Sequence, residues 1–157
     1  IKAHLESDSE KKLVIVGDVP YKDAYAENLK KLAGDRVRFI GYVRDPEELM
    51  ALYQNCFTYI HGHKFGGTNP AMLKAMSNNC AILALDTRFN KEMLRNGELG
   101  LFFTENTESI INAMKKLEKN PEFVEQLKAE VSSGLTEKYN WDSVTAAYQL
   151  AMSTIYK

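Results

Sequence analysis

The sequence has few cysteines, few prolines and no long apolar run. It contains two cysteines and four prolines in 157 residues. Cys56 and Cys80 form no C-x-x-C pair and belong to no Cys/His cluster with metal-ligand spacing, so neither a disulfide framework nor a zinc site is expected. No apolar run approaches the roughly 20 residues of a membrane span, and residues 1–6 lack the regions of a signal peptide. These absences favour a cytoplasmic protein whose core forms without disulfides or metal.

No sign of charge dominates the sequence. Lys and Arg number 20 and Asp and Glu number 21, which leaves a formal net charge of -1. A nearly neutral chain has no overall field to draw it onto nucleic acid or an anionic membrane. Hydrophobic residues make up 45% of the chain, which is enough to fill a single core at this length. We therefore expect one compact domain without a nucleic-acid partner.

Residues 1–6 have the pattern of a helix end. Ile1 and Leu5 are spaced i, i+4 in a polar background, which is typical of the last turns of an amphipathic helix. We expect the chain to begin inside this helix and therefore to be a fragment of a longer protein.

Short apolar runs alternate with helical patterns over residues 13–103. Strands are predicted at the apolar runs 13–17, 37–41, 57–60, 81–85 and 100–103. Helices are predicted between them, at 24–32, 46–55, 70–78 and 90–96. Asp45-Pro46 and Asn69-Pro70 each combine an N-cap residue with proline at the first helical position. Because parallel neighbours need helical crossovers, this alternation predicts one doubly wound parallel sheet.

Two of the predicted strands are apolar at nearly every position. Residues 13–17 read Leu-Val-Ile-Val-Gly, and residues 81–85 read Ala-Ile-Leu-Ala-Leu. Such runs are typical of parallel strands with both faces covered, so we expect both strands to be buried. Cys56 and Cys80 lie beside apolar strands and are expected to pack as small hydrophobic residues.

Only helical patterns follow residue 103. They cover residues 107–119, 121–131 and 141–156, and the first carries an amphipathic stripe. The expected fold is therefore α/β, a doubly wound parallel sheet with a C-terminal helical tail, in a single domain over residues 1–157.

The segment from His61 to Pro70 concentrates groups that bind ligands. It reads His-Gly-His-Lys-Phe-Gly-Gly-Thr-Asn-Pro and follows a predicted strand, and ligands bind at the carboxyl ends of strands in open α/β sheets. Gly66 and Gly67 allow a close approach of the backbone, and the free N–H groups of the next helix attract a phosphate or diphosphate. The alternative is a turn that needs glycine for its geometry alone, since the loop matches neither the Walker A motif nor the dinucleotide fingerprint.

Other polar residues give weaker signals. His61 and His63 share a face of an extended segment, but two histidines without a carboxylate or a third ligand are a poor metal site. His4 is expected on the surface of its helix. Asp18 and Asp86 each follow a strand, where capping of the next turn is the simplest role and ligand contact the alternative. No arrangement for nucleophilic catalysis is recognisable, so no catalytic residue and no metal ligand is predicted.

Four segments along the chain follow the order of a known family's motifs. Leu13 to Asp18 matches Leu-x-Ile-x-Gly, and Val37 to Val43 matches Val-x-Phe-x-Gly-x-Val. Gly66 to Met76 takes the place of Glu-Gly-Phe-Gly-Leu-Pro-x-x-Glu-Ala-Met. Ala81 to Asp86, followed by Gly100 to Phe103, matches Pro-Val-Ile-Ala-Ser-Asp and Gly-Leu-Leu-Phe. Together they resemble the C-terminal, nucleotide-sugar-binding domain of GT-B glycosyltransferases, the Rossmann-like half of the retaining group one enzymes.

The resemblance implies a division of labour within a longer protein. This domain would bind a nucleotide-diphosphate sugar, and a preceding domain would bind a saccharide or lipid-linked saccharide acceptor, with retention of anomeric configuration. No cofactor or metal is required, and the whole protein would be cytoplasmic or peripherally associated with the inner face of the membrane. Residues 66–70 and 86–90 most resemble a bacterial subgroup that includes polysaccharide rhamnosyltransferases.

The resemblance also implies which residues bind the donor. Residues 66–69 would approach the diphosphate and sugar, and residues 41–43 would lie near the base. The full set is Gly17, Gly41, Tyr42, Val43, His63, Gly66, Gly67, Thr68, Asn69 and Lys74.

Two positions depart from the family motif. Gly66 and Lys74 stand where the family has glutamates. The second glutamate accepts hydrogen bonds from the ribose hydroxyls, and an ammonium group cannot accept. A lysine in the first turn of the predicted helix would also oppose the helix dipole, by about 1 kcal/mol or less. We expect Lys74 to face solvent or to contact a phosphate weakly, and the departure puts activity in question.

Three functions agree with the sequence. The first is the donor-binding part of a glycosyltransferase of bacterial surface polysaccharide synthesis, inactive as this fragment alone. The second is a non-catalytic interaction module or partner subunit with the same fold, which Gly66 and Lys74 motivate. The third is a domain like that of a sugar-nucleotide epimerase, or another doubly wound phosphate-binding protein such as a flavodoxin.

Overall fold

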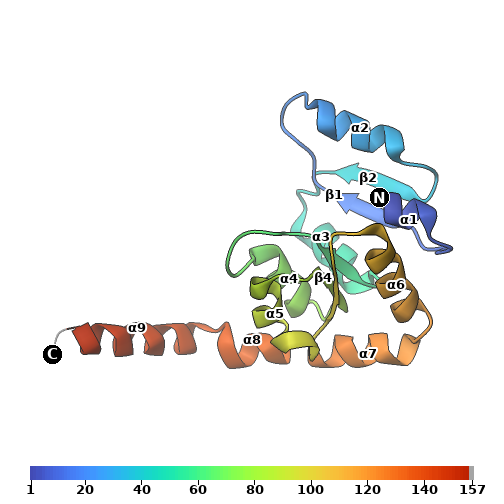
Figure 1. Cartoon of the computed structure of the whole chain (residues 1–157). Helices are drawn as coiled ribbons and strands as arrows, with labels where there is room; N and C mark the ends of the chain where they lie inside the picture. Colours follow the sequence, from blue (N-terminus) through green and yellow to red (C-terminus); the bar gives the residue numbers. More distant parts are fainter. Residues whose placement is uncertain (156–157) are drawn as a thin grey trace.

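Strands and helices alternate in the structure as the sequence predicts. The computed structural model describes residues 1–155 (Figure 1). Its strands are β1 (Leu13–Val16), β2 (Val37–Gly41), β3 (Tyr59–His61), β4 (Ile82–Leu85) and β5 (Leu101–Phe103). Its helices are α1 (Lys2–Glu6), α2 (Ala24–Leu32), α3 (Pro46–Asn55), α4 (Pro70–Ser77), α5 (Arg88–Met93), the 3-10 helix η1 (Arg95–Gly97), α6 (Thr107–Glu118), α7 (Pro121–Glu130), α8 (Ser133–Lys138) and α9 (Trp141–Ile155).

Every helix that directly follows a strand begins with a side-chain cap. The capping residues are Asp23, Asp45, Asn69, Thr87 and Asn106, and each accepts a hydrogen bond from a backbone N–H two or three residues later. Such a cap contributes about 1 kcal/mol to helix stability. Pro46 and Pro70 occupy the first helical positions of α3 and α4, as predicted.

Two helices differ from the prediction. Helix α5 starts at Arg88 rather than Asn90, because the Thr87 hydroxyl caps it. Helix α8 was not predicted, since its short sequence has no apolar stripe. Gly134 in α8 packs tightly, because a Cβ atom there would lie 2.7 Å from Met76 Cε, so packing rather than local pattern positions this helix. The predicted last helix includes Tyr156, which lies outside the described residues.

The strands form two parallel sheets rather than one. β1 pairs with β2, with Leu13 opposite Val37. The second sheet has the order β3-β4-β5, with Tyr59 opposite Ile82 and Leu83 opposite Leu101. The parallel pairing with helical crossovers confirms the doubly wound α/β class. In place of the single sheet that the sequence predicts, β1 and β2 form one sheet and β3, β4 and β5 form another.

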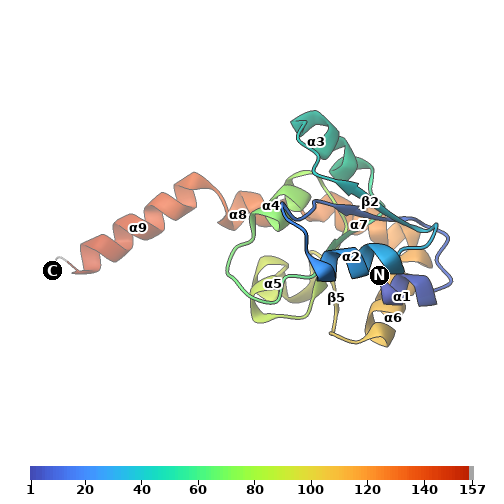
Figure 2. The same cartoon turned by 90° about the horizontal axis from the view of Figure 1, so that it is seen from above.

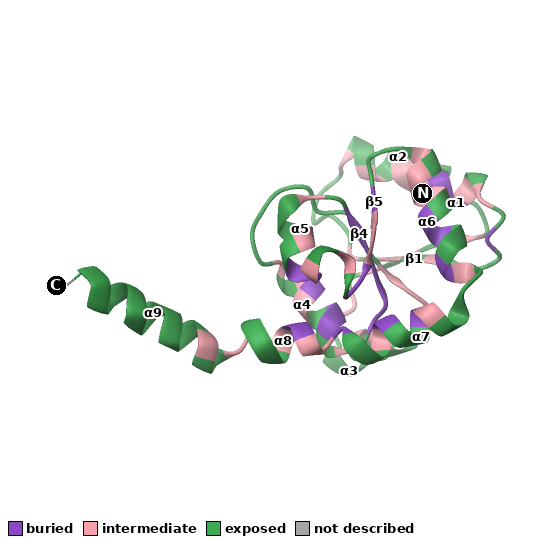
Figure 3. Cartoon of the chain, turned by 60° about the horizontal axis from the view of Figure 1, so that its bottom comes forward, coloured by how far each residue is buried: buried purple, intermediate pink, exposed green. Residues whose placement is uncertain are grey.

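β4 is the centre of the hydrophobic core. All four of its residues are buried, as expected for a strand covered on both faces. One face contributes Ile82 and Ala84 to a cluster with α4, α5 and Val131. The other face contributes Leu83 and Leu85 to a cluster with α6 and α7. Cys80 and the half-buried Cys56 pack in the first cluster, which confirms their role as small hydrophobic residues. Figure 3 shows this concentration of buried residues around β4.

The expected burial of β1 on both faces is wrong. Leu13 and Ile15 are half-buried, whereas Val14 and Val16 are each 43% exposed. The β1–β2 pair lies beside α2 (Figure 1), and within residues 1–155 it pairs with no strand of the three-stranded sheet. Its strands therefore alternate between a covered and an uncovered face, in spite of their apolar sequence.

Helix α1 is attached by buried contacts. His4 is buried at 5% exposure, so its expected surface position is wrong. α1 packs against α6, which covers one side of the helix. The Arg36 guanidinium donates hydrogen bonds to the carbonyl oxygens of Leu5, Ser7 and Ser9 at 2.6, 3.0 and 2.6 Å. These bonds tie the end of α1 to the segment before β2.

Helix α9 extends away from the rest of the protein (Figures 1 and 2). None of its residues is buried, and Trp141 is 84% exposed. Within residues 1–155, no helix combines the length and the hydropathy needed to cross a membrane.

Candidate functional site

The loop between β3 and α4 contains the predicted glycine pair. Gly66 has a φ angle of +113°, which side-chain-bearing residues rarely adopt. A Cβ atom built on Gly67 would meet no atom within 4 Å, so its backbone is open to an approaching ligand. The Asn69 side chain accepts from Ala71 N at 2.9 Å, which fixes the start of α4. The positive end of the α4 dipole thus faces an open glycine loop, an arrangement that attracts phosphate groups.

Two histidines at the start of this loop stack on one another. The ring centroids of His61 and His63 lie 4.9 Å apart, with 22° between the ring planes. His61 is buried at 1% exposure and its Nδ1 atom lies 3.3 Å from the Tyr59 hydroxyl, whereas His63 is exposed. Burial, and to a smaller extent the adjacent His63 ring, lower the pKa of His61 to about 4. His61 is therefore neutral near pH 7 and holds the exposed His63 against the strand end.

Asn90 and Glu105 join this loop to the ends of the neighbouring strands. The buried Asn90 amide donates to Leu85 O at 2.9 Å and to His63 O at 3.3 Å. Lys64 forms an exposed ion pair with Glu105, at 2.8 Å, beyond the end of β5. Neither residue was predicted from the sequence as part of the site. Asn90 had a weak signal, because it lies in the short helix that follows β4, where the carboxyl ends of strands meet.

Lys74 lies in the last turn of α4 rather than the first. The helix begins at Pro70, so Lys74 is its fifth residue of eight. The expected unfavourable interaction of Lys74 with the helix dipole is therefore wrong. A lysine near the C terminus of a helix is favourable to the dipole. Lys74 is exposed and forms no ion pair within the described part of the chain.

The other predicted donor residues gather where β1 and β2 end. Gly17 N donates to Gly41 O at 2.7 Å, and both glycines have positive φ angles, +107° and +69°. Tyr42 follows with 59% of its surface exposed, and Val43 is half-buried. Over residues 1–155, no hydrogen bond or ion pair joins this group to the loop after β3. The predicted residues therefore form two groups, each at the carboxyl end of one sheet.

The two aspartates after strands are held by nearby groups. The Asp18 carboxylate accepts from Val19 N at 2.8 Å and pairs with Lys30 at 3.1 Å, and these bonds lower the pKa of Asp18 in that order of importance. Asp86 forms an ion pair with Lys91 at 2.6 Å. For Asp18, the bond to Val19 N agrees with the simple capping role.

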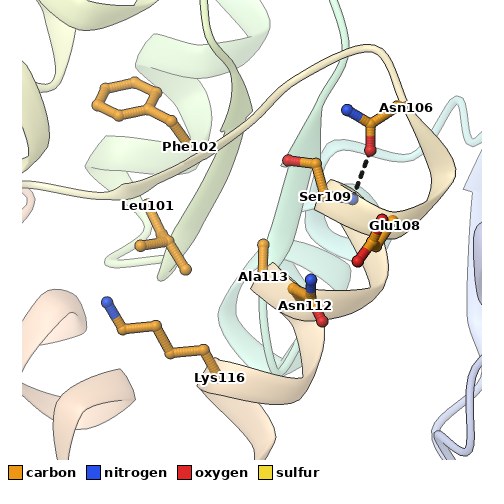
Figure 4. A pocket seen from close by; sticks show the side chains of 8 residues that line it. All are labelled: Leu101, Phe102, Asn106, Glu108, Ser109, Asn112, Ala113 and Lys116. Atoms are coloured by element: carbon orange, nitrogen blue, oxygen red, sulfur yellow. Dashed lines mark hydrogen bonds between the residues drawn. The ribbon is translucent and has the colours of Figure 1, made fainter.

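Two hollows lie beside the second sheet. One, of about 360 Å³, runs along residues 59–63 and so reaches the histidine pair. The larger, of about 480 Å³, lies between β5 and α6 (Figure 4). Two of its polar side chains are engaged in starting α6, since Asn106 accepts from Ser109 N at 2.7 Å and the Ser109 hydroxyl accepts from Thr104 N at 2.9 Å. None of the predicted donor residues lines it, so the smaller hollow is the one that belongs to the candidate site.

Three known proteins are similar to this chain, one in sequence and two in fold. An uncharacterized glycosyltransferase of Methanocaldococcus jannaschii is 28% identical over 155 residues, which cover 95% of this chain and 39% of that protein. Sucrose-phosphate synthase from Thermosynechococcus elongatus superposes with a TM-score of 0.77 at 18% identity, over 92% of this chain and 38% of that one. HepE of Anabaena, in complex with UDP, superposes with a TM-score of 0.75 at 16% identity, over 99% and 44% of the two chains.

These likenesses confirm the fold that the sequence predicts, the Rossmann-like domain of GT-B glycosyltransferases. The chain spans less than half the length of these relatives. The family model described as "Glycosyl transferases group 1" matches residues 2–132. Since this match covers most of the chain, the protein belongs to the group 1 family of glycosyl transferases.

Proposed function

We propose that the chain is the donor-binding part of a glycosyltransferase that moves a sugar from a nucleotide-diphosphate donor to a saccharide acceptor. The observation that carries the proposal is the open Gly66-Gly67 loop at the positive end of α4, in a chain of this family. HepE, whose fold is similar, is in complex with the nucleoside diphosphate UDP. The proposed ligand therefore has the charge that this loop attracts.

The proposed contacts divide between the two groups of residues. The backbone of residues 66–69 and the start of α4 bind the diphosphate and sugar, with His63 beside them. Gly17 and residues 41–43 lie nearer the base, where the exposed Tyr42 ring offers a surface for stacking. Lys74, in the last turn of α4, faces solvent and leaves the ribose hydroxyls without the acceptor that the family motif provides.

This chain's proposed contribution to transfer is electrostatic. As the bond between the sugar and the diphosphate breaks, negative charge develops on the leaving phosphate oxygens. The N–H groups at the start of α4 are held in place by the Asn69 cap and Pro70, so they stabilise that charge without reorganising. We propose transfer with retention of configuration, in a cleft with a preceding domain that binds the acceptor, and we assign no cofactor or metal to this chain.

The cellular setting is a further part of the proposal. Residues 66–70 and 86–90 favour a role in bacterial surface polysaccharide synthesis, with a saccharide or lipid-linked saccharide acceptor. We place the whole protein in the cytoplasm, in peripheral contact with the inner face of the membrane.

Titration of the 157-residue chain with UDP and dTDP, followed by NMR, tests the donor site. We expect the largest amide shifts at residues 63–69. Gly67→Ala adds a methyl group in open space at an ordinary φ angle, so the fold is retained while the backbone approach is blocked. The dissociation constant should rise at least about tenfold, equivalent to about 1.4 kcal/mol.

Gly34→Ala is the matched control for this experiment. Gly34 also has an ordinary φ angle, and its Cβ would meet Leu5 Cδ2 at a normal 3.6 Å, before β2 and away from both groups of donor residues. Its nucleotide affinity should equal that of the unaltered chain. Shifts that map away from residues 63–69, or equal losses in the two variants, would contradict the donor site.

A non-catalytic partner subunit with the same fold is the second candidate. Gly66 and Lys74 favour it, since both replace family glutamates. Lys74 is exposed and forms no ion pair within residues 1–155. Sugar transfer by the whole protein without any partner would rule it out. Transfer that appears only on addition of a second glycosyltransferase subunit would support it.

A further inference from the structure

The two cysteines of the chain lie side by side. Cys56 and Cys80 are 24 positions apart in the sequence, yet their Sγ atoms are 3.8 Å apart, which is a contact distance. Both are free thiols. Cys56 precedes β3 and Cys80 precedes β4, so the pair lies at the amino ends of two parallel strands. The glycine loop lies at the carboxyl end of β3, so the candidate site does not explain this pair.

The end of helix α4 fixes the position of Cys80. Asn79 has a φ angle of +54°, the left-handed conformation that terminates many helices. Asn79 N donates to Met76 O at 3.1 Å, and Cys80 N donates to Ala75 O at 3.0 Å. These two bonds have the pattern of a Schellman motif, which holds the backbone of Cys80 against the helix.

A single carbonyl group accepts from both thiols. Tyr53 O lies in the last turn of α3, where carbonyl oxygens lack partners within the helix. The Cys56 thiol donates to it at 3.2 Å, and the Cys80 thiol donates to it at 3.1 Å. Because the two thiols share this acceptor, their sulfur atoms are held next to each other.

The two thiols differ in exposure and in acidity. Cys56 is half-buried, whereas Cys80 is 1% exposed, so a reagent from solvent reaches Cys56 first. The hydrogen bond with the Cys80 thiol lowers the pKa of Cys56 more than burial raises it, and the charge of Lys128 lowers it further. The same bond and burial raise the pKa of Cys80. Cys56 therefore supplies the thiolate and Cys80 the remaining S–H group, a division typical of reactive cysteine pairs.

We propose that Cys56 and Cys80 form a redox modification site, which hydrogen peroxide converts to a disulfide. The Cys56 thiolate attacks one peroxide oxygen, the O–O bond breaks, and the departing hydroxide takes up a proton to become water. The Cys80 sulfur then attacks Sγ of the Cys56 sulfenic acid, the S–O bond breaks, and a second water leaves with the Cys80 proton. The thiols lose two protons and two electrons in total, and the peroxide is reduced to two waters.

The surroundings of the pair favour a reversible modification. In the cytoplasmic setting proposed for this protein, thiols are kept reduced and disulfides are typically transient. A disulfide bond is about 2.05 Å long, so the two sulfur atoms must move closer to form it. Since Cys80 is fixed by the end of α4, this movement falls on Cys56, in the segment between α3 and β3. The disulfide then links α3 to the start of β4, and this inference does not depend on the proposed function.

Peptide mapping after peroxide treatment tests the proposal directly. Trypsin releases Cys56 and Cys80 in separate peptides, residues 45–64 and 75–88, whatever other cysteines a longer polypeptide contains. After treatment of the folded protein, we expect one linked product that is about 2 Da lighter than the two peptides together and that dithiothreitol separates. Protein unfolded in urea is the control, and it should form the link at least about tenfold more slowly because the thiols are no longer held together.

Two serine variants distinguish the roles of the sulfur atoms. Cys80→Ser lacks the second thiol, so the Cys56 sulfenic acid should persist and its labelling by dimedone should rise at least about tenfold. Cys56→Ser retains only the buried thiol and should not be labelled.

The linked peptide in the unaltered protein decides the proposal even where a variant fails to fold. Recovery of both peptides with free thiols after peroxide treatment would overturn it. So would a disulfide that forms only between two copies of the chain, or oxidation of Cys56 to a sulfinic acid while Cys80 stays free.

Discussion

The N-terminal unit, residues 13–41, and the central unit, residues 59–138, are built from the same strands and helices but differ in burial. Val37 is the one buried residue of the N-terminal unit, whereas all four residues of β4 are buried in the central unit. β1 and β4 are similarly apolar in sequence. The burial of a strand is therefore decided by the strands and helices around it, and hydrophobicity alone does not reveal which of two similar strands forms the core.

A truncation in each unit should separate them most clearly. Leu83 in β4 is completely buried, so Leu83→Ala should lower the free energy of unfolding by about 2–5 kcal/mol through lost burial and a residual cavity. Val14→Ala in β1 removes two partly exposed methyl groups and should cost less than about 1 kcal/mol. Urea unfolding of both variants measures the difference. Equal costs would contradict the contrast between the units.

Acid should destabilise the central unit through His61. Its pKa is about 4 in the folded protein against 6.5 in an exposed histidine, so the unfolded chain binds the proton more readily. The contribution of His61 is complete above pH 6.5 and is lost as the pH falls toward 4, by about 1–3 kcal/mol at 1.36 kcal/mol per pKa unit.

Unfolding of His61→Phe between pH 7 and pH 4 is the control for this pH dependence. The variant should lose most of the slope and keep the part due to His4, whose pKa is also lowered, chiefly by burial. An unchanged slope in His61→Phe would show that another group is responsible.

Arg36→Ala should release α1 from the N-terminal unit. The guanidinium donates to three backbone carbonyl oxygens at the end of α1, so its loss should cost about 1–3 kcal/mol. Arg36→Lys should recover only part of that loss, since an ammonium group lacks the planar fork. Arg38→Ala, on the exposed side of β2, should cost almost nothing. Amide exchange of residues 3–6 would locate the effect, and an Arg38→Ala variant as unstable as Arg36→Ala would contradict it.

The smallest effect is expected in the glycine loop of the central unit. Gly66→Ala must adopt a φ angle of +113° and should destabilise the protein by about 1 kcal/mol. Gly67→Ala, at an ordinary φ angle with open space around it, should leave the unfolding midpoint unchanged. Thermal unfolding compares the two variants. A larger loss in Gly67→Ala would show that the loop is packed more tightly than the structure indicates.

Local chemistry made much of the fold predictable. Asp45-Pro46 and Asn69-Pro70 mark helix starts that the structure confirms, because a cap and a proline act within a few residues of themselves. The end of the strand before the candidate loop was predictable from its apolar run, because a hydrophobic run is also a local feature of the sequence. The family and its fold followed from the order of four motifs, which the family match confirms.

Contacts between distant residues were not predictable. His4 is buried because α1 packs on α6, about 100 residues later, and nothing near His4 in the sequence indicates that contact. Asn90 reaches His63 across 27 residues, which adds a residue to the candidate site that its own helix pattern does not mark. The helix start at Pro70 was predicted correctly, but Lys74 was misplaced along the helix: it is the fifth of eight residues and therefore lies in the last turn.

The sequence by itself determined the class of fold, the order of its elements and the loop on which the donor-site prediction rests, since these depend on periodicity, caps and glycine conformation over short distances. The tertiary structure decided that β4 is fully buried while the equally apolar β1 has one exposed face, and that His61 is buried while His63 faces solvent. The physical reason is that the burial of a side chain depends on which other segment packs against it. The residues near that side chain in the sequence do not reveal which segment this is.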